Sequence, residues 1–300
     1  MNWKSEIRGF ESYLKLERGL SQNSISAYLL DVRKLAQYLD ENAPKSVIKV
    51  SQEDLLGFIA SLNDIGIKAR SQARIVSGLK GFFKYLLMEK IISVDPSELI
   101  ESPKLGMKLP VTLTVEEIED MFSAVDLSSP QGARNRTMLE LLYGCGLRVS
   151  ELTELKISQI HFNEGFIQVI GKGNKERLVP FGGQASRQLK LFLDNNRRHV
   201  QPKKGFEDHI FLNKHGRKIS RVTVFNIIKK LCERCEIKKN VSPHTFRHSF
   251  ATHLVHGGAD LRAVQEMLGH ESITTTEIYT HLDRDFLRTV ILDHHPRNKK

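Results

Sequence analysis

The stretch Ser102-Pro-Lys-Leu-Gly-Met-Lys-Leu-Pro110 decides how this chain is organised. It carries two prolines and one glycine and shows neither helical nor strand periodicity, whereas the segments on both sides of it are regularly patterned. A chain of 300 residues is also longer than one small domain requires. We therefore expect two domains, residues 1–101 and residues 112–300, joined by a linker at residues 102–111.

The composition is that of an ordinary globular protein, with 40% hydrophobic and 27% charged residues. These fractions exclude collagen-like, low-complexity and largely disordered chains. No apolar run has the length of a membrane span, and residues 1–20 mix charged with apolar side chains instead of forming a signal-peptide core. Three cysteines cannot crosslink a chain of this size, and they fit a reducing compartment. We expect a cytoplasmic protein without disulfides and without a membrane partner.

The chain is basic, with 45 lysines and arginines against 35 acidic residues and a formal net charge of +10. Most of the excess lies beyond residue 105. A basic balance is typical of proteins that bind nucleic acid, but a solvated charged surface has the same composition. Charge alone leaves both interpretations open, so the motifs must decide between them.

The N-terminal domain is expected to consist of helices. Four segments before the linker show helical spacing: residues 4–17, 24–39, 51–63 and 68–90. The last of them carries an apolar stripe at core spacing, formed by Ile75, Leu79, Phe82 and Leu86. It also carries a second, basic stripe, formed by Arg70, Arg74, Ser77, Gly81 and Lys84. The second stripe is either a solvated face or a phosphate-contacting one with Gly81 allowing close backbone approach, and the two-domain plan favours phosphate contact.

The C-terminal domain is expected to be mostly helical with a small β-sheet, so the fold class is mainly α. Thr114 followed by Glu117 forms a capping box that opens its first helix. Helices are expected at residues 115–125, 133–143, 184–198, 222–235, 243–256, 261–268 and 275–282. Residues 165–180 differ, because two apolar runs flank Gly171-Lys-Gly-Asn-Lys175. They predict a β-hairpin with a basic tip.

His244 and Arg247 stand at the start of one expected helix. Ser242 suits the cap of that helix, and Pro243 at its first position needs no amide partner. A spacing of three residues places the imidazole and the guanidinium on one face, near backbone amides that favour an anion. The motif is either a phosphate site or a polar helix start with an ordinary surface arginine.

Arg148 follows a helix that glycines interrupt, in Tyr143-Gly-Cys-Gly-Leu-Arg-Val-Ser-Glu-Leu152. Glu151 lies three residues further on and can orient the guanidinium, whose planar fork suits two phosphate oxygens. Another junction is Leu268-Gly-His270, where the glycine can end a helix in a left-handed cap. Nine residues later comes Tyr279, which taken alone is most simply a packed aromatic side chain.

In this order the motifs resemble those of the tyrosine recombinases, the integrase family, and they look most like the Xer-type chromosome-dimer resolvases. The resemblance spans nearly the whole chain. It is carried by Gly146-Leu-Arg-Val-Ser-Glu-Leu152, Gly171-Lys-Gly173, His244-Thr-Phe-Arg247, Leu268-Gly-His270, Thr276-Glu-Ile-Tyr-Thr-His281 and, in the first domain, Arg70-Ser-Gln-Ala-Arg74. Each motif is weak alone, but five in order are specific.

The resemblance implies roles for these residues. Tyr279 would be the nucleophile, and Arg148 and Arg247 would clamp the phosphate. Lys172 would protonate the leaving group, and His244 would be the base. The remaining members of the site are His270 and, in support, Glu151. With the basic stripe and the hairpin tip, the resemblance also implies DNA contacts at Arg70, Arg74, Ser77, Lys84 and Lys175.

Elementary chemistry agrees with these roles. A tyrosine hydroxyl with a pKa of about 10 is ionised to about one part in a thousand at pH 7, so a base must take its proton. Arginines stabilise the charge that grows on the phosphorus. Attack gives a 3′-phosphotyrosyl link and a free 5′-hydroxyl, so bond energy is retained without ATP or a divalent metal. We expect no cofactor.

Three other patterns are interpreted as structural. Cys232 and Cys235 have the spacing of a zinc or redox pair, but the sequence has no second pair, and Cys235 continues an apolar stripe. Histidine pairs between residues 244 and 256 lack the glutamate of a zinc protease motif. The glycine-rich hairpin tip does not spell a nucleotide-binding loop. We assign no metal and no nucleotide.

The resemblance also implies an assembly. The two domains would form a C-shaped clamp around double-stranded DNA that carries a specific core site. The active form would be a tetramer on two such sites, made of this chain alone or with a related recombinase, and the family allows for a DNA translocase as activator. Residues 291–297 would reach a neighbouring subunit, with residues 290–292 docked and the last few disordered.

Three other functions are compatible with parts of the sequence. An integrase of a mobile element would use the same chemistry on other sites. An enzyme similar to type IB topoisomerases would relax supercoils without exchanging strands. A DNA-architectural protein would bind DNA without forming a covalent adduct, and the complete set of site residues argues against it.

Overall fold

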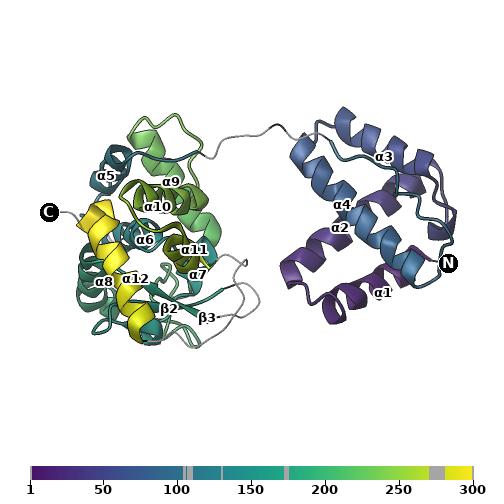
Figure 1. Cartoon of the computed structure of the whole chain (residues 1–300). Helices are drawn as coiled ribbons and strands as arrows, with labels where there is room; N and C mark the ends of the chain where they lie inside the picture. Colours follow the sequence, from purple (N-terminus) through teal and green to yellow (C-terminus); the bar gives the residue numbers. More distant parts are fainter. Residues whose placement is uncertain are drawn as a thin grey trace. The chain divides into compact units, whose positions relative to one another are not determined.

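The computed structural model describes residues 2–103, 106, 111–129, 131–171, 176–269 and 281–298, with residues 281–285 described by their backbone. The chain divides into two compact units, Met1–Lys108 and Leu109–Lys300 (Figure 1), and each has its own hydrophobic core. The architecture is mainly helical with one small sheet, which confirms the predicted fold class. Within the described ranges, no helix is long and apolar enough to cross a membrane.

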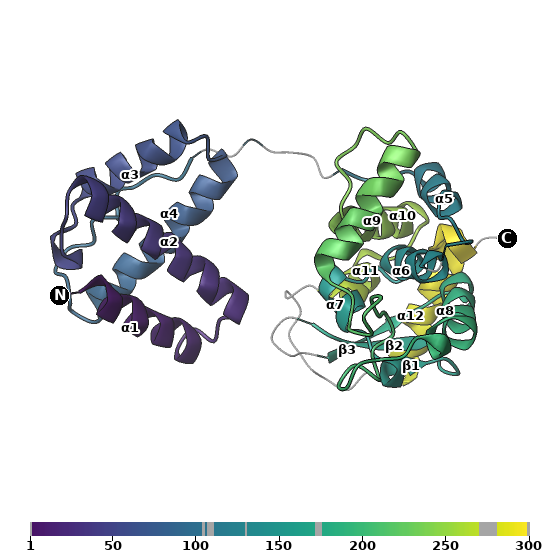
Figure 2. The ribbon, with the colours of Figure 1, turned by 180° about the vertical axis from the view of Figure 1, so that it is seen from behind.

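The N-terminal unit is built from helices whose positions agree with the sequence prediction to within a few residues. They are α1 (Trp3–Leu16), α2 (Gln22–Asn42), α3 (Gln52–Asp64) and α4 (Ala69–Met88). Helix α4 packs against α1 and α2 (Figure 2). The predicted core stripe of α4 is confirmed, because all four of its apolar side chains are at most 2% exposed.

An ion pair joins α2 to α4 at the edge of this core. Asp31 is fully buried and accepts two hydrogen bonds from Arg74, the longer of which is 2.7 Å from Nη2 to Oδ1. Gly78 makes room for the pair, since a Cβ there would lie 2.8 Å from Asp31 Oδ2. A Cβ on Gly81 would lie 3.8 Å from the ring of Phe10, so Gly81 borders the core and is not part of a bare exposed stripe.

The C-terminal unit combines helices with a small sheet at one edge (Figure 2). The helices are α5 (Val115–Ser123), α6 (Gly132–Gly144), α7 (Val149–Glu154), α8 (Gly183–Asn195), α9 (Arg221–Arg234), α10 (Pro243–His256), α11 (Leu261–Leu268) and α12 (His281–His294). Helix α7 is an addition to the predicted set, because six residues span fewer than two turns and show no full period. The predicted bounds of α10 and α11 are confirmed residue for residue.

The described strands form one antiparallel sheet in the order β1-β2-β3. They are β1 (Ile160–His161), β2 (Phe166–Ile170) and β3 (Glu176–Pro180). Strands β2 and β3 are the predicted hairpin, and Ile167 lies opposite Val179. The tip with Lys172 and Lys175 lies outside the described residues. Strand β1 escaped prediction because two residues are too short to show alternation.

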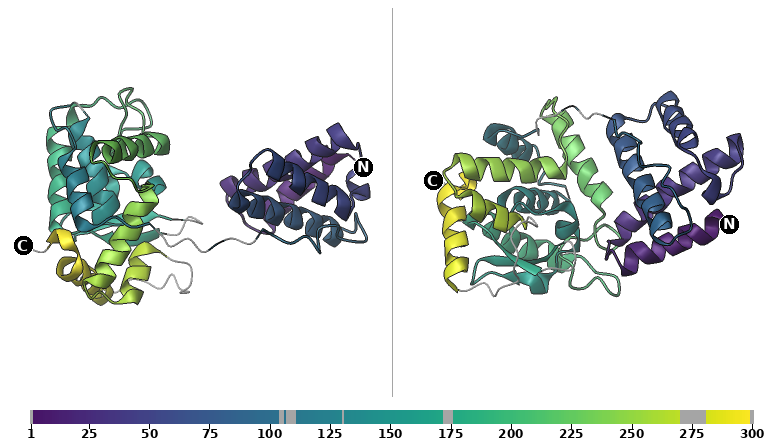
Figure 3. Two further views of the ribbon diagram at one scale, coloured as in Figure 1. Left: turned by 90° about the horizontal axis from the view of Figure 1, so that it is seen from above. Right: turned by 45° about the vertical axis from the view of Figure 1, so that its right-hand side comes forward.

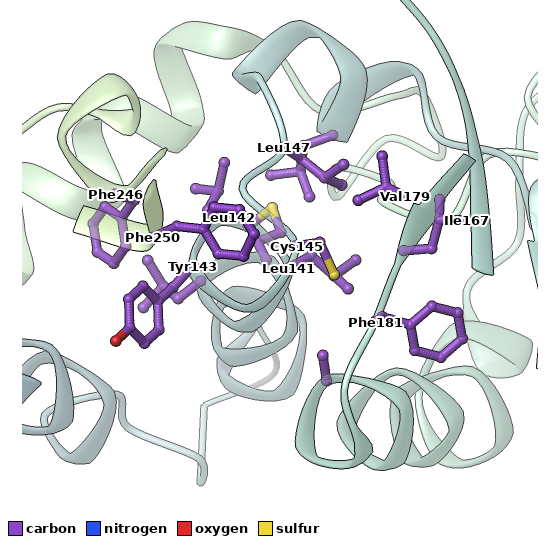
Figure 4. Close-up of a cluster of buried hydrophobic side chains, with 14 of the residues drawn as sticks. Leu141, Leu142, Tyr143, Cys145, Leu147, Ile167, Val179, Phe181, Phe246 and Phe250 are labelled. Atoms are coloured by element: carbon purple, nitrogen blue, oxygen red, sulfur yellow. The ribbon is translucent and has the colours of Figure 1, made fainter. Parts of the chain in front are cut away.

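The end of α6 lies at the centre of the C-terminal core (Figure 4). Its apolar side chains contact Phe246 and Phe250 of α10 on one side and Ile167 and Val179 of the sheet on the other. Gly146 follows with a φ of 58°, and a Cβ there would lie 2.5 Å from the ring of Phe250. Both constraints select glycine, so the chain can turn sharply just after α6.

One expected helix ends early. The sequence predicted a helix over residues 184–198, but α8 ends at Asn195 and a 3-10 turn, Arg197–His199, follows. The cause is the guanidinium of Arg197, which is 6% exposed. It donates hydrogen bonds to three carbonyls of the following loop, those of Val200, Glu207 and His209. The side chain therefore anchors the loop and stops the helix.

The C-terminal segment packs on its own unit. Helix α12 lies against α10, α11 and β3 (Figure 3), and Leu287, Val290 and Ile291 are buried in the core. The predicted helix over residues 275–282 falls mostly outside the described residues, and the observed helix runs on to His294. Docking of this segment on a neighbouring subunit stays a prediction.

Polar contacts fasten the end of that segment. His295 is 1% exposed, and its ring centroid lies 4.7 Å from that of Tyr143. Arg297 pairs with Glu119 of α5, at 2.7 Å, and with Glu140 of α6. The expected disorder of the last few residues therefore does not extend to Arg297, because two carboxylates hold its side chain. Residues 299–300 lie outside the described residues.

Candidate active site

Three arginines from different elements meet at the C-terminal end of α11. Arg177 of β3 donates from Nε to the carbonyl of Met267 at 3.0 Å, and Arg148 donates from Nη2 to the carbonyl of Gly269 at 3.1 Å. Arg247 of α10 donates from Nη2 to the carbonyl between them. The last carbonyls of a helix have no partner within it and form the negative end of its dipole. The three cations therefore cap α11 together.

The turn after α6 contributes two groups to this cluster, the carbonyl of Gly146 and the side chain of Arg148. Arg148 is the N-cap of α7, with the extended backbone angles φ −70° and ψ 149°. The carbonyl of Gly146, just before it, accepts a hydrogen bond of 2.7 Å from Nη1 of Arg247. The glycine turn thus fixes the start of α7 and the position of a guanidinium on α10 at once.

Gly269 confirms the predicted left-handed cap, with a φ of 62°. A Cβ at this position would lie 2.9 Å from Cδ of Arg177, so the backbone rests directly on that side chain. Glycine is required for both reasons. His270, the next residue, lies outside the described residues, but its backbone neighbour is fixed at the arginine cluster.

Glu151 is the carboxylate that joins two of the arginines. It accepts hydrogen bonds of 2.7 and 2.9 Å from Arg177, and bonds of 2.8 Å from both Nη1 and the backbone N–H of Arg148. Burial alone would raise the pKa of this carboxyl, but the hydrogen bonds and charges of Arg177 and Arg148 outweigh it and hold the pKa below its usual value. Glu151 is therefore ionised and orients Arg148, as the sequence predicted.

Among the described residues the cluster has more positive than negative charge, because it contains three guanidinium groups and the carboxylate of Glu151, which bonds two of them. This excess of positive charge affects the guanidinium of Arg247. Burial first, and then the charges of Arg148 and Arg177, lower the pKa of its guanidinium to about 9, although Glu151 opposes the change. An anion beside these groups would relieve the repulsion. Arg148, whose side chain is 30% exposed, is open to such an anion.

The other predicted site residues lie in three places. His244 is exposed in the first turn of α10, three residues before the buried Arg247, and Pro243 occupies the first helical position as predicted. In the N-terminal unit, Arg70, Arg74, Ser77 and Lys84 are all exposed on α4. Four predicted site residues lie outside the described residues: Lys172, Lys175, His270 and Tyr279.

Sequence reasoning missed Arg177. The signal was present, because positions 177 and 179 lie on the same face of a strand and Val179 is apolar. A charged side chain on the buried face of a strand requires a partner. The partner is 26 positions away in the sequence, and no local spacing connects the two.

Among the patterns interpreted as structural, the structure describes the cysteines. Cys232 is a free thiol in the core, 7% exposed, and burial raises its pKa to about 11, so the thiol is protonated at neutral pH. In the part of the chain that the structure describes, no group of three or more histidine, cysteine or acidic side chains is placed to hold a metal ion.

Comparison with known proteins identifies this arrangement. The model of the phage integrase family matches residues 111–285, and that of the phage integrase N-terminal SAM-like domain matches residues 7–90. The chain belongs to the phage integrase family. Within that family it is a site-specific tyrosine recombinase, an enzyme, which confirms the resemblance seen in the motifs.

The relatives support this over nearly the whole length. The tyrosine recombinase XerD of Halalkalibacterium halodurans is 42% identical over 294 residues, which is 98% of each chain. The XerD of Chlorobaculum tepidum is 43% identical over 298 residues, 98% of this chain and 97% of its own. Among solved structures, XerH recombinase bound to a difH substrate before cleavage has a TM-score of 0.68 and 26% identity, and covers 94% of this chain and 83% of its own.

Replacing Glu151 should destabilise the C-terminal unit. In Glu151→Ala the buried guanidinium of Arg177 loses its carboxylate, and breaking a buried pair in this way costs about 3 kcal/mol. Urea unfolding followed by circular dichroism measures the loss. The matched control is Glu154→Ala in the same helix, whose side chain is 57% exposed and whose loss should cost below about 0.5 kcal/mol. Equal stability of the two variants would contradict the account.

Proposed function

We propose that this tyrosine recombinase cuts and rejoins double-stranded DNA through a 3′-phosphotyrosyl intermediate on Tyr279, and that it resolves chromosome dimers before segregation. The observation that carries the chemistry is the excess positive charge of the arginine cluster at the end of α11. A scissile phosphate is the anion that this charge suits. The names of the relatives, recombinases of the Xer group, support the biological role.

The two arginines with proposed contacts to the phosphate differ in mobility. Arg247 is 9% exposed and held by two carbonyls, so it presents a fixed charge. Arg148 is more exposed and is oriented by Glu151, so its free N–H groups can reach non-bridging oxygens. Preorganised donors of this kind stabilise the charge that develops on the phosphorus without moving during the reaction.

The reaction exchanges one phosphodiester bond for another. The phenolic oxygen of Tyr279 forms a bond to phosphorus as the bond to the 5′-oxygen breaks. His244 accepts the phenolic proton, and its exposed place beside the helix position of Arg247 suits that role. Lys172 on the hairpin tip gives a proton to the departing 5′-oxygen, and His270 completes the site. Attack by a second 5′-hydroxyl reverses the step on another strand.

The N-terminal unit supplies further DNA contacts in this proposal. Its exposed polar face on α4 carries Arg70, Arg74, Ser77 and Lys84, and the two bonds to Asp31 orient Arg74 while offsetting part of its charge. Lys175 adds a contact from the hairpin tip. Residues 102–111 act as the linker of a clamp around the core site. The solved XerH relative is bound to its difH substrate, which supports a DNA site of this kind.

The proposed assembly is a tetramer on two core sites in the cytoplasm. It consists of this chain alone or of this chain with a related recombinase, and a DNA translocase acts as its activator. In that assembly the C-terminal segment docks on a neighbouring subunit through the side chains that its own unit leaves exposed. The exposed side chains of Phe286, at 54%, and Leu292, at 42%, support it, because an interface would cover apolar surface that α12 leaves open on its own unit.

Tyr279→Phe should abolish the covalent complex. With nicked duplex DNA carrying a core site, the wild-type chain should trap a protease-sensitive adduct in the presence of a metal chelator, since neither a metal nor ATP takes part. Tyr143→Phe is the control, because that phenol is buried in the same unit and burial raises its pKa. Tyr143→Phe should still form the adduct, and an adduct formed by Tyr279→Phe would show that the nucleophile is misassigned.

Replacing Arg70 should weaken DNA binding in a salt-dependent manner. Each lost phosphate contact reduces the slope of log K against log salt concentration by about 0.9. The slope is measured by fluorescence anisotropy with a labelled duplex for wild type, Arg70→Ala and Arg8→Ala. Arg8 is an exposed arginine on α1, outside the basic stripe. A slope unchanged in Arg70→Ala would place this residue away from the DNA.

A further inference from the structure

We propose that Arg177 is a positioning residue for strand cleavage. It binds Glu151 so that this carboxylate can orient Arg148 without neutralising it. The inference rests on the proposed function, because it concerns the same phosphate site. It assigns a role to a side chain that none of the sequence motifs contains.

The geometry of the carboxylate carries the argument. Each oxygen of Glu151 accepts one hydrogen bond from Arg177 and one from Arg148. Oε1 accepts from Nη1 of Arg177 at 2.7 Å and Nη1 of Arg148 at 2.8 Å. Oε2 accepts from Nη2 of Arg177 at 2.9 Å and the backbone N–H of Arg148 at 2.8 Å. The bidentate bond from Arg177 therefore fixes the plane of the carboxylate, and with it the side chain of Arg148.

Burial separates the two arginines by role. The side chains of Arg177 and Glu151 are 7% and 2% exposed, whereas that of Arg148 is 30% exposed. All three nitrogens of the Arg177 guanidinium already donate hydrogen bonds: Nη1 and Nη2 to Glu151, and Nε to the carbonyl of Met267. Arg177 thus lies behind the site and acts through Arg148, which is open to a ligand.

The positive charge of Arg177 also matters for the pair of Arg148 and Glu151. A carboxylate bound only to Arg148 would form a neutral pair and cancel much of the attraction that this arginine exerts on a phosphate. The second guanidinium restores a net positive charge to the triplet of Arg148, Glu151 and Arg177. The backbone at the end of α11 fixes the position of Arg177. Gly269 packs on its side chain, and the carbonyl of Met267 accepts a hydrogen bond from its Nε. Loss of Arg177 should therefore both tilt Arg148 and weaken its charge.

Arg197 shows what a purely structural arginine looks like in the same unit. Its exposure, 6%, matches the 7% of Arg177. It donates to the three carbonyls of its loop, and the structure pairs it with no carboxylate among the described residues. It is therefore a matched control for the loss of a buried guanidinium away from the cluster.

The test is single-turnover cleavage of nicked duplex DNA by full-length chains, with a normal phosphate or an uncharged methylphosphonate at the scissile position. On the phosphate, Arg177→Met should cleave about 100-fold more slowly than wild type, the size of effect that misplacement of a catalytic group produces. The Kd for the DNA should stay close to that of wild type. On the methylphosphonate, the defect relative to wild type should shrink to less than about tenfold, because less charge needs stabilisation.

Two further variants keep the proposal testable. Arg177→Lys, which keeps the charge but loses the bidentate geometry, should cleave the phosphate faster than Arg177→Met, and it replaces that variant if the latter does not fold. Arg197→Met should lose thermal stability and retain cleavage. Arg177→Met cleaving like wild type would overturn the inference, as would an equal defect on both substrates. A wild-type chain that forms no covalent adduct would overturn the proposed function as well, so the two failures are distinguishable.

Discussion

The capping of α11 by three guanidinium groups is the interaction around which the C-terminal unit is arranged. It joins β3, the start of α7 and the second turn of α10 to three consecutive carbonyls. Cations repel one another, and the negative end of a helix dipole offsets this repulsion and holds the three of them close together. Two glycines, Gly146 and Gly269, bring the backbone near enough for these contacts. The fold thereby concentrates positive charge at a place where an anion can bind.

Most of the fold could be predicted from the sequence, because helical periodicity is a local property. The bounds of α10 and α11 follow from Ser242 with Pro243 and from Gly269, each of which has a local physical cause. The site was predictable only in part. The spacing of Arg148 and Glu151 indicated their contact, but the bond from Arg177 to Glu151 joins elements that meet only in the folded unit. The early end of α8 has the same origin, since it depends on distant carbonyls around Arg197.

The C-terminal segment adds a second constraint on the same core. Tyr143, at the end of α6, packs against the tilted ring of His295 and also contacts His253 of α10 through a 2.8 Å hydrogen bond. Glu140, one turn earlier, pairs with Arg297. The helix that leads into the Gly146 turn is therefore held by the tail of the chain as well as by the sheet. If His295 and Arg297 move in an assembly, the end of α6 and the turn before Arg148 should shift with them.

The central claim is that the arginine cluster exists to hold the scissile phosphate. The most direct measurement is a structure of the Tyr279→Phe chain bound to an uncut core site. The account predicts a non-bridging oxygen of that phosphate about 2.7–2.9 Å from guanidinium nitrogens of both Arg148 and Arg247, with Arg177 still on Glu151. A scissile phosphate that contacts neither Arg148 nor Arg247 would contradict it.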